Sequence, residues 1–283
     1  MSAMATTTLG VKRLSGVLGA EIDGVDLSGH LEPETVAAIR AAWIEHHVLV
    51  FRNQSLTHDE QVRFAASMGE IQVHPFVQSG PDHPQVMELI VEADDETNFG
   101  GGWHTDLTCL EAPVLGSILY AVELPDVGGD TLFADQQAAY DALSDAMKSV
   151  LDGLGAVHSA GSQYGSTGVA IDHKSMKTGN HDAAVAEVVH PVVRTHPESG
   201  RKGLFINSAY VTEIVGFTRP ESDALLSFLF RHAVEERFTC RVSWEPGTVV
   251  MWDNRSVQHQ ALHDYAGERR HMRRVTVRGD RPV

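Results

Sequence analysis

Short apolar segments recur along most of the chain and constrain its fold more than any other feature. Clusters of Gly, Pro and Asp separate them, for example at 125–129 and 245–247, and such clusters mark turns. Many short strands at close spacing favour a β-sandwich or barrel over a doubly wound sheet. The phosphate-binding patterns GxGxxG and GxxxxGK[ST] do not occur, so nucleotide folds have no support. The predicted strands are residues 48–51, 86–91, 116–122, 188–195, 203–206, 239–244, 248–252 and 272–277.

Helical signals separate several of these strands. Pro33 precedes apolar residues at helical spacing, which suits a first helical turn. Thr57 and Glu60 form a capping-box pattern at the start of another helix. The expected helices are residues 33–46, a helix from Thr57 to near Gly69, one or two helices within 136–154 with Ser144 as a cap between them, and 220–234. The sequence therefore predicts a fold that is mostly β with flanking helices.

The balance of charge excludes several classes of partner. The chain of 283 residues has 38 Asp and Glu against 22 Lys and Arg, a formal net charge of −16. A surface that binds nucleic acid needs a basic footprint, so no nucleic-acid partner is expected. No apolar run approaches the roughly 18 residues of a membrane span, and residues 1–8 look like a disordered tail rather than a secretory signal. The two cysteines form no CxxC pair, which fits a reducing compartment, so we expect a cytoplasmic protein.

Two segments depart from the pattern of short strands. Residues 160–187 are rich in Gly, Ser, His and Asp without apolar periodicity, which predicts either a mobile surface insertion or an active-site lid. Residues 255–281 hold seven of the 22 basic residues, and charge alone would make them a solvated edge strand. No linker or internal repeat divides the chain, so we expect one domain over residues 1–283.

One His-x-Asp pattern occurs among the 16 histidines, at His104 and Asp106. Residues i and i+2 of a strand face the same side, so both side chains could reach one metal ion. The His-x-Glu pairs that begin at His30, His58 and His196 fall at helix starts or in a turn. A chain of this composition would contain about one His-x-Asp by chance, so a metal site also requires a third ligand from elsewhere.

The best candidate for that third ligand is His259. It follows the apolar strand at 249–252 and precedes the arginine cluster, although His263 and His271 are rivals. Two His and one carboxylate form a facial triad that leaves adjacent coordination positions open, which suits Fe(II). Zinc hydrolases can use similar ligands, so the triad alone leaves the chemistry open.

Four ordered motifs give the chain a resemblance to a known family. They are WHTD (103–106), GGDTLF (128–133), WDNRSVQH (252–259) and DYAGERRHMRRVT (264–276). Together they resemble the taurine dioxygenase (TauD/TfdA) group of Fe(II)/2-oxoglutarate-dependent oxygenases. The resemblance runs from about residue 14 to the C-terminus and implies a double-stranded β-helix, or jelly-roll, core.

The resemblance also implies roles for particular residues. The implied iron ligands are His104, Asp106 and His259. Thr131 and Arg270 match the positions that hold the distal carboxylate of 2-oxoglutarate, and a guanidinium suits a carboxylate as a bidentate fork. Arg274 matches the position that binds the anionic head of the substrate. Arg269 and Arg273 keep the interpretation of a solvated basic edge.

Other substrate contacts follow from the same resemblance. His74 matches a residue that touches a sulfonate, and Tyr210 matches an aromatic wall. Gly100 stands where taurine-specific members have Asn, and Val77 stands where they have Tyr. Both changes remove polar groups that would hold a small zwitterion. The stretch at 200–205 also resembles the aryloxyalkanoate dioxygenases of the family.

The resulting hypothesis is a 2-oxoglutarate-dependent dioxygenase that uses Fe(II) and O2. It would hydroxylate a small anionic substrate, a sulfonate such as taurine, an alkyl sulfate or an aryloxy or alkyl carboxylate, and give succinate and CO2. The resemblance suggests a homodimer or homotetramer. Two alternatives remain at this point: a zinc hydrolase with the same triad, and a non-catalytic jelly-roll binding module.

Overall fold

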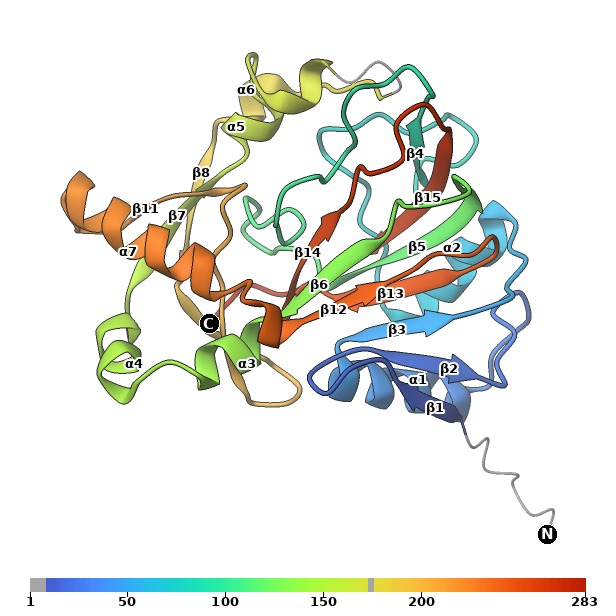
Figure 1. Cartoon of the computed structure of the whole chain (residues 1–283), viewed down its shortest axis with the longest axis horizontal. Helices are drawn as coiled ribbons and strands as arrows, with labels where there is room; N and C mark the ends of the chain where they lie inside the picture. The colour runs from blue at the N-terminus through green and yellow to red at the C-terminus, as the bar shows by residue number, and fades with distance from the viewer. Residues whose placement is uncertain (1–8, 173–175) are drawn as a thin grey trace, which may run out of the picture.

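A seven-stranded sheet sets the frame of the molecule (Figure 1). The computed structural model describes residues 9–172 and 176–283, so the predicted tail at 1–8 lies outside the described residues. Neighbouring strands are antiparallel except for the parallel pair β2 and β3. In spatial order the strands are β1 (Gly10–Arg13), β2 (Ala20–Asp23), β3 (Val48–Phe51), β13 (Val249–Asp253), β5 (Gly116–Glu123), β15 (Arg270–Val277) and β4 (Met87–Val91).

A three-stranded sheet packs against one face of the large sheet. Its strands, in spatial order, are β12 (Thr239–Val242), β6 (Thr131–Asp135) and β14 (Val257–Ala261). Val50 and Trp252 of the large sheet share one buried apolar cluster with Phe133 and Val257 of the small one. Successive residues of a strand face opposite sides, so the alternate residues of β3 are free to line a second core. The two sheets therefore form two β layers with a common core.

Helices cover the opposite face of the large sheet (Figure 1). They are α1 (Pro33–His46) and α2 (His58–Met68). Trp43 and Phe64 pack there against Leu49 and Phe51, the alternate residues of β3. The predicted capping box at Thr57 is confirmed, because its side chain accepts from the Glu60 N–H while the Glu60 carboxylate accepts from the Thr57 N–H.

A second group of elements extends beyond the two sheets. Its strands are β7 (Gly155–Ser159), β8 (Glu187–Pro191), β9 (Val193–Thr195), β10 (Lys202–Leu204) and β11 (Val211–Ile214). Its helical elements are α3 (Gln136–Asp141), α4 (Asp145–Leu151), α7 (Arg219–His232) and the short η2 (Glu236–Phe238). Leu151, Val192, Leu204 and Leu229 belong to the apolar core that these elements share.

The segment 160–187 contains short helices and packs against a distant loop. The helices are α5 (Gly161–Tyr164), η1 (Val169–Asp172) and α6 (His181–Ala184). Val77 forms an antiparallel bridge with Thr178, and the Gly179 N–H donates to the Phe76 carbonyl at 2.8 Å. Tyr164 shares a buried cluster with Phe76 and Val77. The described part of this segment is therefore attached to the 73–79 loop.

The expected fold class, mostly β with flanking helices, is confirmed. Two helices occupy 136–154, and the Ser144 side chain between them accepts from the Met147 N–H, as predicted. The expected strand 188–195 is two strands, because the chain passes from one sheet to another at Val192. The sequence did not predict β1, β2, β6, β7, β11 or β14. No helix among the described residues is long and apolar enough to cross a membrane.

The interpretation of Arg273 as part of a solvated edge was wrong. Strand β15 lies between β5 and β4, and α2 contacts its outer face. Arg273 is buried, donates to the Leu56 carbonyl and to His58 Nδ1, and lies over the Tyr120 ring. Arg269 is partly exposed and forms ion pairs with two glutamates. The arginines of β15 are therefore buried, and they do not form a solvated edge.

Candidate active site

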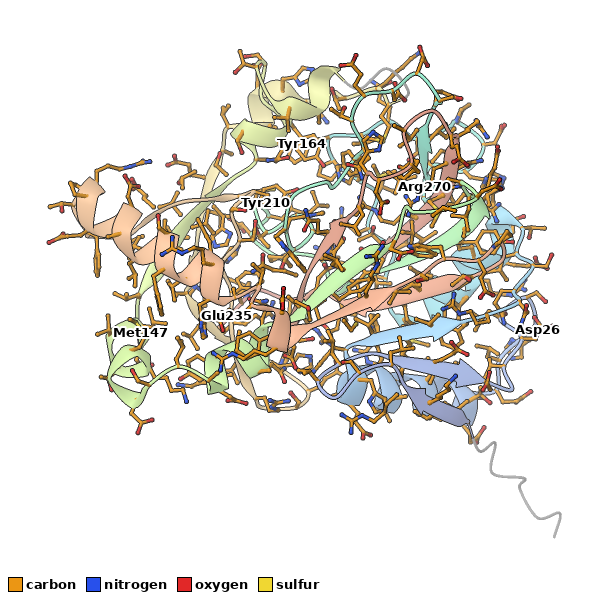
Figure 2. All side chains as sticks on the ribbon, viewed as in Figure 1. Asp26, Met147, Tyr164, Tyr210, Glu235 and Arg270 are labelled. Atoms are coloured by element: carbon orange, nitrogen blue, oxygen red, sulfur yellow. The ribbon has the colours of Figure 1, made fainter. Side chains whose placement is uncertain are left out.

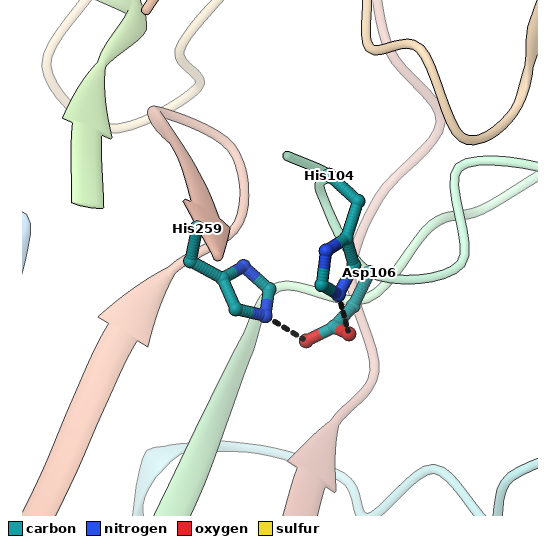
Figure 3. A group of neighbouring side chains, drawn as sticks. All are labelled: His104, Asp106 and His259. Carbon is teal, nitrogen blue, oxygen red and sulfur yellow. Dashed lines mark ion pairs between the residues drawn. The ribbon is translucent and has the colours of Figure 1, made fainter. Parts of the chain in front are cut away.

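Three side chains that are distant in the sequence converge in the fold (Figure 3). His259 lies on β14, and His104 pairs with it through an isolated antiparallel bridge whose two backbone hydrogen bonds measure 3.0 and 2.8 Å. His104 Nε2 lies 3.7 Å from Asp106 Oδ1, and His259 Nε2 lies 3.8 Å from Asp106 Oδ2. The structure thus brings together the three metal ligands that the resemblance implied.

The two imidazoles are neutral and turn a nitrogen toward the carboxylate. His104 Nδ1 lies 2.8 Å from the Gly102 carbonyl, which can only accept, so Nδ1 carries the proton and Nε2 keeps its lone pair. His259 Nδ1 has no hydrogen-bond partner among the described residues. Burial lowers the pKa of both rings. Both side chains are therefore in the protonation state that a metal ligand needs.

The carboxylate of Asp106 is buried among donors. Arg274 Nη1 donates to Oδ1 at 3.0 Å, and Ser117 Oγ donates to Oδ2 at 2.7 Å. Burial alone would raise the pKa of Asp106, but the guanidinium of Arg274, with His259 and His104, holds it well below its usual range. Asp106 is therefore ionised at neutral pH.

These side chains fit a divalent metal. Among the described residues they form the only group of three or more His, Cys, Asp or Glu whose ligand atoms lie within 4.8 Å of one another. Two ligand atoms that each lie about 2.1 Å from an ion are at most about 4.2 Å apart, and both Nε2–Oδ distances satisfy this limit. The two other histidines considered as the third ligand have different neighbours. His271 contacts Glu88, and His263 packs edge-on against Tyr265. Two neutral imidazoles and one carboxylate suit Fe(II).

Thr131 and Arg270 line the same cavity as the two histidines. This cavity is narrow, with a volume of about 30 Å³. Arg270 is buried, its Nη2 donates to the Gly129 carbonyl at 3.2 Å, and its Nε has no partner among the described residues. A buried guanidinium with a free N–H group is prepared to bind a carboxylate.

Trp244 completes this corner and was not predicted from the sequence. Its Nε1 donates to Thr131 Oγ1 at 3.0 Å, so the Thr131 hydroxyl hydrogen stays available for a ligand. Its ring also lies under the guanidinium of Arg270, 5.8 Å from Cζ to the ring centroid. Trp244 lies two residues after the end of β12, and an apolar residue in that position gave no signal of a site.

Arg274 and His74 each have a buried nitrogen without a partner among the described residues. In Arg274 that nitrogen is Nε. His74 Nδ1 accepts from the N–H groups of Phe76 and Val77 at 3.2 and 3.0 Å, so the proton of the neutral ring is on Nε2. That Nε2 is buried without an acceptor among the described residues. Burial, and then the guanidinium of Arg274, lower the pKa of His74 to about 3, so its ring stays neutral.

A larger cavity of about 520 Å³ opens beside His104 and Asp106. Tyr210 lines it, as expected, but His74 borders a separate hollow of about 450 Å³ together with Val77. Most of the residues that line the large cavity are aromatic or have small side chains. They include Phe99, Trp103, Tyr164, Val169, Ala170 and Ala209. The sequence had assigned none of them individually to the cavity, although Trp103 belongs to the WHTD motif and residues 164, 169 and 170 lie in the segment expected to be a surface insertion or a lid.

Tyr164 connects this cavity to the anion-binding side chains. Its ring stacks on Phe76 at 5.0 Å and meets His74 edge-on at 5.5 Å. Its phenol interacts with that of Tyr210, and burial raises the pKa of both. Figure 2 shows Tyr164 on the segment that contains α5, apart from Arg270 on the strands of the large sheet. The described part of 160–187 therefore contributes directly to the cavity wall.

Gly100, one of the two departures from the taurine pattern, has a structural reason. Its φ is +79°, and a Cβ there would lie 3.1 Å from His104 Cε1. Both the left-handed backbone and the close imidazole disfavour a side chain at this position. A side chain at Gly100 would require the His104 ring to shift by a few tenths of an ångström.

Comparisons with known proteins agree with this geometry. The family model described as "Taurine catabolism dioxygenase TauD, TfdA family" matches residues 10–276. An alpha-ketoglutarate-dependent sulfate ester dioxygenase from Pseudomonas putida is 38% identical, over 97% of this chain and 91% of that protein. An alkylsulfatase from Acinetobacter baylyi is 36% identical, over 97% and 86%. The crystal structure of a putative alpha-ketoglutarate-dependent taurine dioxygenase from Burkholderia xenovorans superimposes with a TM-score of 0.84 at 35% identity, over 98% of this chain and 94% of that one.

Proposed function

The chain belongs to the TauD/TfdA family of taurine catabolism dioxygenases, and we propose that it oxidises a sulfate ester or sulfonate with an apolar tail. As a member of this family it is a 2-oxoglutarate-dependent dioxygenase, which consumes 2-oxoglutarate and O2. The alternatives of a zinc hydrolase and a non-catalytic module are therefore set aside. The predicted oligomer and the cytoplasmic location stay predictions.

Fe(II) would be held by His104, Asp106 and His259. It supplies the centre at which O2 and the oxo acid react, with 2-oxoglutarate converted to succinate and CO2. Arg270 would grip the distal carboxylate of 2-oxoglutarate with its free Nε, and the Thr131 hydroxyl would donate to the same group. The two-layer arrangement of antiparallel sheets supports a jelly-roll core for this site.

One observation carries the choice of substrate: Arg274 and His74 have buried donors without acceptors among the described residues, and both contact aromatic side chains of the large cavity. Arg274 lies over Phe99, and His74 meets Tyr164 edge-on. Arg274 Nε and His74 Nε2 would share an anionic head. The carboxylates that line the cavity are Asp106, which is already paired, and the exposed Glu96. The ammonium group of taurine would therefore meet few acceptors, whereas an apolar tail would contact Phe99 and Trp103.

The chemistry of such a substrate gives a distinct product. Hydroxylation of the carbon that bears a sulfate ester oxygen forms a hemiacetal ester, which breaks down to an aldehyde and hydrogensulfate. A hydrolytic sulfatase would instead release an alcohol and would need neither O2 nor 2-oxoglutarate. Both relatives described above have names that refer to sulfate esters or alkyl sulfates.

The test compares hexyl sulfate, taurine and phenoxyacetate as substrates of the Fe(II)-loaded enzyme. We expect kcat/KM, measured by succinate formation, to be at least about tenfold higher for hexyl sulfate, because burial of each further CH₂ contributes about 0.8 kcal/mol. Hexanal and sulfate should form in equal amounts with succinate. A preference for taurine or phenoxyacetate, or hexanol formed without 2-oxoglutarate, would contradict the proposal.

A further inference from the structure

Asp106 forms hydrogen bonds with neighbouring side chains, and the other two proposed metal ligands, His104 and His259, lack such bonds among the described residues. Ser117 Oγ donates to Asp106 Oδ2 at 2.7 Å, and Asn254 Nδ2 approaches the same oxygen at 3.5 Å. Asn254 Oδ1 also accepts from the Asp106 N–H at 3.3 Å. In contrast, the His104 ring forms its hydrogen bond with a backbone carbonyl, and His259 Nδ1 has no partner among the described residues. The carboxylate is thus the ligand with the most side-chain support.

These supporting side chains come from the rigid centre of the large sheet. Ser117 is the second residue of β5 and pairs with Trp252 of β13 on one side and Thr276 of β15 on the other. Asn254 directly follows β13, and its N–H donates to the Leu115 carbonyl at 2.9 Å. Ser117 is 0% exposed and Asn254 2% exposed. Neither backbone can move without disturbing central strand pairs.

The two residues also hold each other. Asn254 Nδ2 lies 3.3 Å from Ser117 Oγ, and Asn254 Oδ1 accepts from Trp252 Nε1 at 3.1 Å. The Ser117 hydroxyl therefore accepts from Asn254 while it donates to Asp106. This fixes the direction of its hydrogen, because a hydroxyl has one donor. The arrangement is complete without a ligand, so the carboxylate is oriented in advance.

We propose that Ser117 and Asn254 are positioning residues that fix Asp106 as a one-point metal ligand. A carboxylate has about four acceptor positions. Ser117 and Asn254 occupy two on Oδ2, and Arg274 occupies one on Oδ1. About one position is left for an ion, which keeps Asp106 from chelating through both oxygens and leaves coordination positions open for the other ligands. This inference rests on the proposed metal centre.

The test measures metal binding and not turnover. Metal-free full-length protein is titrated with Co(II), whose visible d–d bands report coordination number and whose dissociation constant follows from the titration. We expect Ser117→Ala to weaken Co(II) binding by about 10- to 100-fold, the usual effect of losing a side chain that supports a metal ligand. The bands should also shift, because the freed Oδ2 can then contact the ion.

A matched control removes a buried hydroxyl elsewhere. Ser222 is 1% exposed, and its Oγ accepts from the Ile214 N–H at 2.9 Å. Ser222→Ala should lower thermal stability in the manner of Ser117→Ala while leaving the Co(II) constant and spectrum unchanged. Ser117→Ala binding Co(II) within twofold of wild type, with the same spectrum, would overturn the inference alone. Wild type that binds no Co(II) would overturn the metal centre itself.

Asn254→Ala tests the same oxygen from the other side. If both donors act on Oδ2, the double variant Ser117→Ala/Asn254→Ala should weaken Co(II) binding by clearly less than the product of the two single effects. Effects that multiply to within a factor of two would remove Asn254 from the proposal. Should Asn254→Ala not fold, because Trp252 Nε1 loses its acceptor, Ser117→Ala with its control still decides the main claim.

Discussion

The two ends of the candidate site are built from different kinds of structure. At the 2-oxoglutarate end, Thr131 lies on β6 and Arg270 on β15, with His259 on the adjacent β14. At the substrate end, His74 lies in the loop at 73–79, Tyr164 ends the four-residue helix α5, and Tyr210 precedes β11. The first end is held by paired strands. The second is held largely by loops that pack against one another, together with Arg274 of β15.

This difference matches the two tasks of the site, which are to bind the 2-oxoglutarate that every reaction of this class uses and to select one substrate. The oxo acid is common to the reaction class, so its site gains from strands whose register fixes each side chain. Loops tolerate changes of length and sequence, and they commonly carry specificity on a rigid scaffold. We therefore expect variants at the strand-held end to affect cosubstrate binding, and variants at the loop-held end to affect the substrate alone.

The largest expected effect is at the strand-held end, for Arg270→Ala. Loss of the buried guanidinium leaves the distal carboxylate of 2-oxoglutarate without its charged partner, a change that costs 2–5 kcal/mol in comparable buried pairs. The dissociation constant of 2-oxoglutarate, measured by calorimetry with Mn(II) bound under anaerobic conditions, should rise by about 30-fold or more. Arg269→Ala is the control, because that neighbour forms partly exposed ion pairs with Glu92 and Glu123. If Arg270→Ala bound 2-oxoglutarate within threefold of wild type, the strand-held end would not be the binding site of the cosubstrate.

A smaller effect concerns stability in acid. Burial lowers the pKa of His158, on β7, to about 3, whereas an unfolded His titrates near 6.5. The unfolded chain therefore takes up a proton below pH 6.5 that the folded chain does not, so stability present above pH 6.5 is lost as pH falls toward 3. Between pH 7.5 and 5.0 this amounts to about 2 kcal/mol. Urea unfolding should show that His158→Asn removes most of that pH dependence.

His74 has the same lowered pKa, about 3, but lies at the loop-held end. A loop can open locally and admit a proton without global unfolding, so His74→Asn should remove less of the pH dependence than His158→Asn. Asn keeps an atom near the position of Nδ1 in both variants, which preserves the contacts with Thr108 or with the N–H groups of Phe76 and Val77. Equal losses in the two variants would show that the loop is as rigid as the strand.

The sequence predicted the strand-held end better than the loop-held end for a physical reason. His104 and Asp106 are two residues apart, and Thr131, His259 and Arg270 belong to the ordered motifs at 128–133, 252–259 and 264–276, although the apolar pattern did not predict β6 or β14. Motif residues that lie on paired strands keep fixed positions relative to one another, so the resemblance could be carried over to them residue by residue. The motifs thus identified side chains that the structure does bring together.

Other features depend on contacts that local pattern does not encode. Tyr164 is 60 residues from His104, inside a segment without periodicity, and it reaches the cavity because that segment packs on the 73–79 loop. Ser117 looks like an ordinary polar residue at the start of a strand, and its role follows from Asp106 lying above it. Arg273 was wrongly expected to be solvated, because the packing of α2 against β15 is a tertiary contact that local sequence does not encode.

The smallest expected effect tests the loop-held end directly. Tyr164→Ala removes a ring that stacks on Phe76 and meets His74, so it should raise the KM for hexyl sulfate by about tenfold, within the range for loss of a buried aromatic contact. The dissociation constant of 2-oxoglutarate should stay within twofold, because Tyr164 does not border the cavity of Thr131 and Arg270. Tyr164→Phe keeps the ring and should change KM by less than threefold. If Tyr164→Phe raised the KM as much as Tyr164→Ala, the important contact would be that of the Tyr164 hydroxyl with Tyr210 and not that of the ring. If Tyr164→Ala also weakened 2-oxoglutarate binding, the two ends of the site would not be independent.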